Sequence, residues 1–486
     1  MQEISEKQPV NLIEALLPLF TLGGLLVLCA VFLELNGQLL VLVILASAAV
    51  AGIIALRHGA TWDDIQRVTG ERFASVLPVI LILLAIGMLI GTWVVSGTIP
   101  YIVYWGIRLV RPDLLVLTAF LATATMSLCT GTSWGSAGTI GVALMGMAGA
   151  LHAPLHIVAG AVVSGAYFGD KMSPLSDSTN ICAMGAGVPL YRSIRHLLYT
   201  AIPSFTACVI VYSLVARMLP VSGDVMPESA RVLLTDLDGA FSLTWIALIP
   251  LIVVLWGIMR KYPPALAISL SSAVAALIAI ITQGITPLAA LTSAVAGAKA
   301  EMLHMNAAPG AQFLTLVQRG GLDSMAPTLV VVIAAFLLAA AMEVSGALNL
   351  LIGRMLASVT SVFRLIAATM ASGATMIALT SHGGVTALVI GGLFQPAYRK
   401  RGLAPENLSR SLEDSVTITE PLMPWTVSAI FMATTLGVPT AAYAPWAVFC
   451  YGGPFFSLLI AATWRFTRFG IKLTDEDHEN CLKPRF

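Results

Sequence analysis

The sequence predicts an all-helical protein that crosses a membrane many times, and three observations lead to this fold class. The 486-residue chain is 58% hydrophobic and only 10% charged, with a mean hydropathy of +0.89. An average soluble domain is about 25% charged. Apolar runs long enough to cross about 30 Å of hydrocarbon recur along the chain, for example at residues 16–32, 39–55 and 76–95. The third observation is an internal repeat.

The repeat relates the two halves of the chain at a nearly constant spacing. Ser75, Pro78 and the Val-Ser-Gly of residues 95–97 recur in the second half at Ser324, Pro327 and residues 344–346. Further along the chain, the register of this alignment drifts slightly. Thr132-Ser133 aligns with Thr380-Ser381, and Pro174-Leu175 aligns with Pro421-Leu422, which places Thr417 opposite Asp170 and Glu420 opposite Ser173.

Each half then follows the same predicted plan. Two plain helices precede an amphipathic connector (residues 62–72 and 312–320), a third helix, a short interfacial helix (101–111 and 348–359), a re-entrant hairpin, a proline-broken helix and a final helix. Five full crossings per half is an odd number, so the second half enters the membrane the other way up. The predicted fold is therefore two inverted repeats, each of about five transmembrane helices plus one re-entrant hairpin and a broken helix.

The charges outside the spans predict the orientation. The loop after the first repeat is acidic, whereas most basic residues, including Arg399-Lys400-Arg401, fall on the other side in this count; Arg108 and Arg111 do not follow the trend. Both termini are therefore expected in the cytoplasm. The predicted segments are a tail at 1–10, a first repeat at 11–219, an extracytoplasmic linker at 220–240, a second repeat at 241–466 and a tail at 467–486.

The two predicted hairpins contain residues that interrupt a helix at membrane depth. Residues 129–138 hold three glycines and four hydroxyls, among them Thr132 and Ser133, and Thr380 and Ser381 lie in the matching segment. Unwound backbone survives in a bilayer only where it is buried in protein or lines a wet cavity. Its carbonyl and hydroxyl oxygens suit a small hard cation. The alternative is a small-residue motif that only packs helices together.

The first broken helix carries the charges that are most costly in a membrane. Asp170, Ser173, Asp177 and Asn180 are spaced by three and four residues, so they share a face wherever the segment is helical. Intramembrane carboxylates usually line an ion or proton route. Desolvation favours the protonated carboxyl and a bound cation favours the ionised form, so the two compete for one group. The alternative for both aspartates is helix capping at a membrane boundary. The neighbouring Ser176 adds a hydroxyl, and Lys171 is expected to pair with Asp177, Glu420 or Glu413, or to extend to an interface.

The second broken helix supplies a carboxylate from the other half. Glu420 precedes the proline that matches Pro174, and Thr417 shares its helical face. Glu413 and Asp414, nearer to Arg410, are either proton-route residues or solvated residues at an interface. Two further proton-route candidates, each with a structural alternative, are Glu343 and His382.

At these residues the sequence resembles the NhaC family of sodium/proton antiporters. The resemblance rests on Gly-Thr-Ser-Trp-Gly at 131–135, on residues 165–180 (Gly-Ala-Tyr-Phe-Gly-Asp-Lys-Met-Ser-Pro-Leu-Ser-Asp-Ser-Thr-Asn) and on Ile194-Arg195-His196. Ser178 stands where family members often have threonine. The resemblance implies a transporter of the bacterial inner membrane, of the ion transporter superfamily, whose members are commonly dimers. The same signature occurs in relatives that exchange malate for lactate or move amino acids with sodium.

The expected function is exchange of sodium for protons by alternating access, with sodium and protons as the transported ions and no cofactor. Asp170 and Asp177 are expected to hold the sodium ion or the proton, with Glu420 as a carboxylate from the second half. The neutral oxygens are expected from Thr132, Ser133, Ser173, Ser176, Asn180, Thr380, Ser381 and Thr417. The alternative is a sodium- or proton-coupled exchanger of a small organic anion or an amino acid.

Other function classes fit the sequence poorly. No HExxH or GxSxG motif is present, which argues against an enzyme. The six cysteines include no CxxC pair, so neither a zinc site nor a disulfide framework is expected. A net charge of +1 without a basic stripe gives no sign of nucleic-acid binding. A passive channel is disfavoured by the inverted broken helices. The lipid bilayer is the expected surrounding.

Overall fold

The structure is a computed structural model that describes residues 10–32, 37–218, 228–260, 262–305, 308–357, 359–381 and 383–474. Within these ranges the chain is helical and has no strand, only an isolated bridge between Leu403 and Leu473. Seven helices in this part are long and apolar enough to cross a membrane, or up to ten if each of three bent helix pairs is one span. The chain is therefore a multi-pass membrane protein, as its composition predicts.

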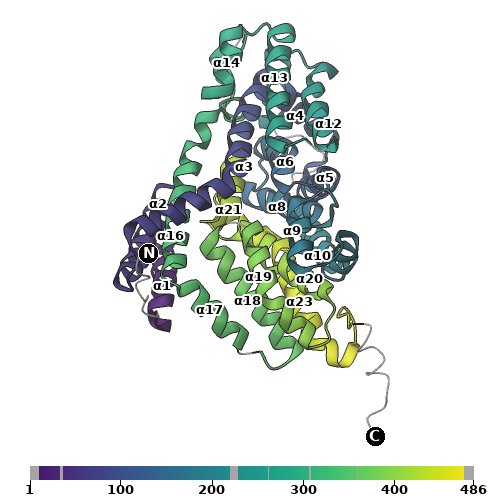
Figure 1. Cartoon of the computed structure of the whole chain (residues 1–486). Helices are drawn as coiled ribbons and strands as arrows, with labels where there is room; N and C mark the ends of the chain where they lie inside the picture. The colour runs from purple at the N-terminus through teal and green to yellow at the C-terminus, as the bar shows by residue number, and fades with distance from the viewer. Residues whose placement is uncertain are drawn as a thin grey trace.

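The helices of the first half form an ordered series along the chain (Figure 1). A glycine-rich bend interrupts it after Thr130, and a proline-containing break interrupts it after Met172. The helices are α1 (Leu12–Phe32), α2 (Gly37–Arg57), α3 (Trp62–Val95), α4 (Thr98–Leu109), α5 (Leu115–Thr130), α6 (Ser133–Ser136), α7 (Val142–Ala150), α8 (Leu155–Met172), α9 (Asp177–Ala186) and α10 (Leu190–Met218).

The second half repeats this order after a surface helix and a set of shorter elements. Its helices are α11 (Glu228–Ala240), α12 (Ile249–Met259), α13 (Pro264–Thr282), α14 (Pro287–Ala296), α15 (Ala311–Val317), α16 (Ala326–Val344), α17 (Ala347–Ala357), α18 (Val362–Thr380), α19 (Gly383–Lys400), α20 (Pro405–Leu412), α21 (Val427–Leu436), α22 (Thr440–Tyr443) and α23 (Val448–Thr467). A π-helical turn, Glu413–Thr417, continues α20, and a 3-10 turn, Glu420–Leu422, precedes α21.

The predicted connector at residues 62–72 is not a separate helix. It is continuous with the span that follows, so that α3 runs for 34 residues and contains Pro78. Thr61 caps its N-terminus in a capping box with Asp64, which satisfies backbone N–H groups of the first turn. In the second half the corresponding connector is interrupted, because Gly320 and Gly321 both adopt positive φ angles between α15 and α16.

Two local structures recur in both halves at one constant interval along the chain. Thr130 and Ser136 share a hydroxyl hydrogen bond of 3.2 Å across the first hairpin bend, and Thr380 and Thr386 share one of 2.7 Å across the second. At each bend the helix ends on a residue in the left-handed region, Gly131 or Ser381. At the breaks, Ser176 and Thr426 each accept a hydrogen bond from the backbone N–H three residues later and so cap α9 and α21.

This constant interval corrects the register expected from the sequence. The Val-Ser-Gly segments keep their predicted match, with equivalent backbone hydrogen bonds at Gly97 and Gly346. At the hairpins and breaks, however, equivalent residues are slightly further apart along the chain than in the Val-Ser-Gly segments. The alignment based on sequence alone placed them slightly closer together. Glu420, and not Thr417, therefore stands opposite Asp170. The matched Pro-Leu pairs misled the alignment because two prolines, Pro421 and Pro424, lie close together in the second break.

Helices α3 and α16 pack against each other in antiparallel directions. Arg72, in the first third of α3, forms an ion pair with Glu343 at the end of α16. Towards the other end of α3, the Gly87 carbonyl accepts a hydrogen bond of 2.7 Å from the backbone N–H of Gly321, which lies before α16 begins. The start of α3 thus contacts the end of α16, and the later part of α3 contacts the residues just before α16, as expected for antiparallel helices.

The core around the first break depends on close contact between α5 and α8. A Cβ atom on Gly169 would lie 2.4 Å from the backbone N of Leu128 and 2.5 Å from the backbone O of Ala124. Nearby, the Ser127 hydroxyl donates a 2.6 Å hydrogen bond to the Ala166 carbonyl. Helix α8 can approach α5 this closely because glycine has no side chain, and this contact fixes the position of its last turn.

Candidate functional site: a carboxylate-lined cavity between two broken helices

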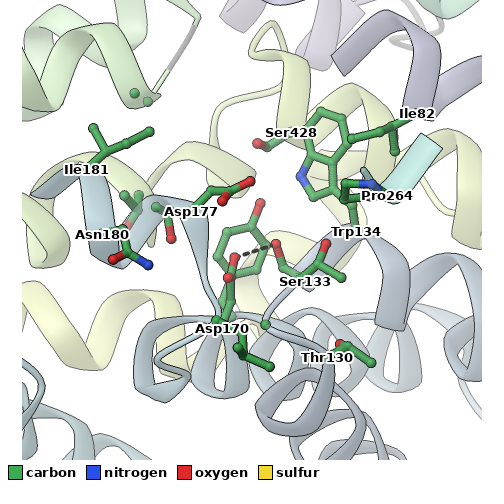
Figure 2. A pocket seen from close by; sticks show the side chains of 18 of the residues that line it. Ile82, Thr130, Ser133, Trp134, Asp170, Asp177, Asn180, Ile181, Pro264 and Ser428 are labelled. Carbon is green, nitrogen blue, oxygen red and sulfur yellow. Dashed lines mark hydrogen bonds between the residues drawn. The ribbon is translucent and has the colours of Figure 1, made fainter. Parts of the chain in front are cut away.

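A cavity of about 790 Å³ lies where the two hairpin bends and the two breaks meet. Figure 2 shows Asp170, Asp177 and Ser133 directing their side chains into it, and Trp134 and Ser428 also belong to its lining. Both halves of the chain contribute to the lining. The predicted site residues that line it are Thr132, Ser133, Asp170, Asp177, Asn180, Ser381, Thr417 and Glu420.

The first break places two carboxylates at opposing helix ends. Helix α8 ends at Met172, residues Ser173 and Ser176 are extended, and α9 begins at Asp177. Asp170 therefore lies in the last turn of α8 and Asp177 in the first turn of α9. The shared face was expected only where the segment is helical, and it does not form here because the residues between the two aspartates are not helical. They reach the same cavity from two separate half-helices.

Asp170 is held in place by the first hairpin. The Ser133 hydroxyl donates a 2.9 Å hydrogen bond to Asp170 Oδ2, drawn as a dashed line in Figure 2. Ser133 is the first residue of α6, and Thr132 caps that helix by accepting from the backbone N–H of Gly135 at 3.2 Å. Gly131, with φ of 69°, makes the reversal before it. The hairpin bend therefore supplies the neutral partner of a buried carboxylate.

In the second half, Glu420 occupies the position equivalent to Asp170 and lines the same cavity. It follows the π-helical turn, is 9% exposed, and faces the side chain and backbone N–H of Ser428. Across the cavity, a Cβ on Gly383 would lie 3.0 Å from Glu420 Oε2. Gly383 and Ser133 occupy matching positions of the repeat. The first bend therefore donates a hydroxyl to Asp170, whereas the second bend places a residue without a side chain against Glu420.

The charge of the cavity is its main chemical property. Asp170, Asp177 and Glu420 line it, and none of the lining residues in the described part of the chain is lysine, arginine or histidine. Hydroxyl, amide and carboxylate oxygens are hard ligands of the kind a small cation prefers. A cavity with three carboxylates and no basic lining residue among those described favours cations and protons over anions.

Three predicted ligands have local hydrogen-bond partners and do not line the cavity. The Ser176 hydroxyl caps α9, and the Ser173 hydroxyl accepts from the backbone N–H of Leu175 at 3.3 Å. Thr380 is bonded to Thr386 within the second hairpin. These side chains shape the bends and breaks that present the lining residues. The capping role considered for the aspartates belongs to Ser176 instead.

Lys171 leaves α8 away from the cavity. Its ammonium forms an ion pair with Asp414, and both side chains are fully buried. None of the partners expected from the sequence is correct, and the extension to an interface is also wrong. Glu413 and Asp414 are 1% and 0% exposed, so they are not solvated at an interface. Sequence reasoning missed this because the pair joins α8 to a segment of the other half of the chain.

Two other proton-route candidates lie elsewhere or outside the described residues. Glu343 pairs with Arg72 at the end of α16 and is not a lining residue of the cavity. His382 falls outside the described residues.

The structure adds lining residues that the sequence analysis did not select. Tyr167 lies one turn before Asp170 and has a buried phenol oxygen without a hydrogen-bond partner. Trp134 lines the wall and stacks on Phe431 with ring centroids 4.6 Å apart. Helical spacing from Asp170 and the repeat of Ser178 at Ser428 are the signals that would have identified Tyr167 and Ser428.

The family model and the similar proteins found by comparison point to the same kind of protein. Residues 165–463, which include both breaks and the second hairpin, match the family described as "Na+/H+ antiporter family". An uncharacterized Na(+)/H(+) antiporter of Haemophilus influenzae is 41% identical over 94% of this chain and 97% of its own length. The Na(+)/H(+) antiporter NhaC of Alkalihalophilus pseudofirmus is 35% identical over 88% of this chain and 90% of its own. A more distant relative, the malate-2H(+)/Na(+)-lactate antiporter of Bacillus subtilis, is 30% identical over 90% of this chain and 91% of its own.

Proposed function

The chain belongs to the Na+/H+ antiporter family, a family of transporters and not of enzymes, and we propose that its cavity is where sodium and protons are exchanged. The observation that carries this proposal is the charge of the cavity. Three carboxylates line it, and no lysine, arginine or histidine does so among the described residues.

Exchange at this site follows from competition for the same oxygens. A sodium ion bound by Asp170 and Asp177 needs both carboxylates ionised, and a proton on either one removes a negative ligand. Ser133, Asn180 and Thr417 supply neutral oxygens at the cavity wall. Sodium leaves when a proton arrives, and a proton leaves when sodium arrives. Thr132 of the first hairpin also lines the cavity, and Ser381 and Glu420 line it from the second half.

Alternating access is supported by the way the two halves are built. Helices α3 and α16 are related by the internal repeat and yet pack in antiparallel directions, with Arg72 beside Glu343 and Gly87 beside Gly321. Equivalent helices that run in opposite directions are expected of inverted repeats. The cavity lies between the halves, so relative movement of the two can open it to one side or the other.

We further propose that the membrane is the bacterial inner membrane and that both termini are cytoplasmic. The basic cluster Arg399-Lys400-Arg401 at the end of α19 supports this orientation, because cytoplasmic loops are rich in lysine and arginine.

The second candidate function is sodium-coupled exchange of a small organic anion. It is favoured by the cavity volume of about 790 Å³, which is within the range of small-molecule sites. It is disfavoured by the absence of a basic lining residue in the described part of the chain, because a carboxylate substrate would then depend on bound sodium for its counter-charge.

The test is ion flux in proteoliposomes that contain the purified protein. An imposed proton gradient should drive uphill sodium uptake with no organic solute present, and adding malate, lactate or amino acids should leave the rate unchanged. A strict requirement for one of these solutes would establish the second candidate instead. Dissipation of the sodium gradient without proton coupling would indicate a passive channel and contradict both.

A further inference from the structure

A buried ion pair lies directly behind the cation cavity and is separate from it. Lys171 follows Asp170 in sequence, but its ammonium bonds to Asp414 and donates a 3.1 Å hydrogen bond to the Thr200 hydroxyl. The Phe449 ring lies 5.7 Å away on another side. Neither Lys171 nor Asp414 lines the cavity.

The charges around this pair are balanced. Two cations, Lys171 and Arg410, and two carboxylates, Glu413 and Asp414, are all buried in this region. Arg410 donates from Nη1 to the Gly470 carbonyl, and Glu413 Oε1 accepts from the Thr179 hydroxyl at 3.5 Å. Other polar groups near the pair include Thr200, Cys182 and Cys450. These four buried charges therefore cancel, in contrast to the three carboxylates that line the cavity.

The position of Asp414 is specified closely by the fold. It lies in the π-helical turn Glu413–Thr417, and a Cβ on Gly453 of α23 would approach its Oδ1 to 2.8 Å. The helix that carries Lys171 also carries Asp170, and Glu413 is the buried neighbour of Asp414, so an ammonium released from Asp414 would remain close to these two carboxylates. An internal ammonium near Asp170 would oppose binding of sodium there.

We propose that Asp414 is a positioning residue that holds the Lys171 ammonium away from the cavity and so keeps Asp170 available to sodium. The proposal rests on the proposed function, because it assigns a role in sodium affinity at that same cavity. Neither residue transfers a proton or binds the ion. The pair differs in this way from the cavity carboxylates, which must be charged for binding.

The test compares Asp414→Asn with the double variant Lys171→Met/Asp414→Asn. Asp414→Asn leaves one uncompensated cation, so the KM for sodium should rise by roughly tenfold or more while the maximal rate is largely kept. The double variant removes that cation and should return the KM toward the wild-type value. The matched control is Glu406→Gln, which removes a carboxylate from α20 whose partners, Arg192 and Lys472, are about half exposed. Its sodium KM should be unchanged.

Binding is measured separately by sodium-dependent thermal stabilisation of the purified proteins, which does not depend on transport. An unchanged KM in Asp414→Asn, or a double variant as impaired as the single, would overturn the proposal. If Asp414→Asn does not fold, the double variant still decides, because a folded double variant without exchange means that the pair acts directly in transport. Failure of the proposed function itself is distinguishable, since the wild-type protein would then show neither sodium-driven proton flux nor stabilisation by sodium.

Discussion

At the scale of single residues, two of the three cavity carboxylates, Asp170 and Glu420, have equivalent positions in the two halves. Asp170 and Glu420 are separated by the same interval as the caps Ser176 and Thr426 that follow them. Their surroundings differ, because Ser133 donates a hydrogen bond to Asp170 and Gly383 occupies the corresponding place beside Glu420. The same position in the repeat thus donates a hydroxyl in one half and in the other is a glycine that lies directly against the carboxylate.

Replacing Asp170 by asparagine should stop exchange while the protein still folds. The amide keeps the size of the side chain and can still bond to Ser133, and burying it costs less than burying an unpaired carboxylate. Removing a charged ligand of this kind costs about 3 kcal/mol, which corresponds to roughly a hundredfold loss. Proteoliposome flux is the measurement, with Ser178→Thr as the control that should be nearly silent. Exchange at the wild-type rate in Asp170→Asn would remove Asp170 from the mechanism.

Replacing Glu420 by glutamine tests the second half of the site independently. If Glu420 shares the ion with Asp170, the sodium KM should rise, because one of three cavity carboxylates is lost. Asp177→Asn provides the comparison from the first half: a similar rise in KM indicates that both carboxylates act on the same ion. Unchanged sodium kinetics in Glu420→Gln, in a protein that expresses normally, would confine the site to the first break.

At the scale of secondary-structure elements, the cavity depends on how closely α8 packs against α5. Gly169 precedes Asp170, and a methyl group there would meet backbone atoms of Leu128 and Ala124. Gly169→Ala should therefore force the helices apart, at a cost of about 1–3 kcal/mol. Thermal unfolding in detergent measures this, with Gly392→Ala in α19 as the matched control, because no atom lies within 4 Å of a Cβ there. Equal thermal stability of the two variants would show that α5 and α8 can move apart without loss of stability.

The sequence predicted these elements better than their connections. The hairpin bends were predicted from helix-breaking residues such as Gly131, and the breaks from Pro174, and both predictions agree with the structure. The ion pair of Lys171 with Asp414 was not predictable, because its partners are far apart in the sequence and only the packing of α8 against the second half brings them together. The register of the repeat at the breaks also needed the structure, since hydrogen bonds at the caps define it more sharply than matching prolines do.

At the scale of the whole molecule, the orientation of the two halves decides how the cavity can open to each side of the membrane. The antiparallel contact of α3 with α16 supports inverted halves. In Figure 1, α19 and α23 lie at the end of the molecule where the last described residues are, and α12, α13 and α14 lie at the opposite end. The basic segment Arg399-Lys400-Arg401 lies at the end of α19, and this charge supports the proposed cytoplasmic location of this end.

Cysteine labelling tests this orientation directly. In a background where all six native cysteines are replaced, Thr235→Cys on α11 and Lys400→Cys at the end of α19 each place a thiol at an exposed position. An impermeant thiol reagent added to intact cells should label Thr235→Cys and leave Lys400→Cys unreacted until the membrane is opened. The reason is that α11 lies in the linker between the two repeats, which is expected outside the cell. The basic end of α19 is expected in the cytoplasm, where loops are rich in lysine and arginine. Labelling of both thiols from outside would contradict the odd number of crossings between them, and with it the inverted arrangement on which alternating access depends.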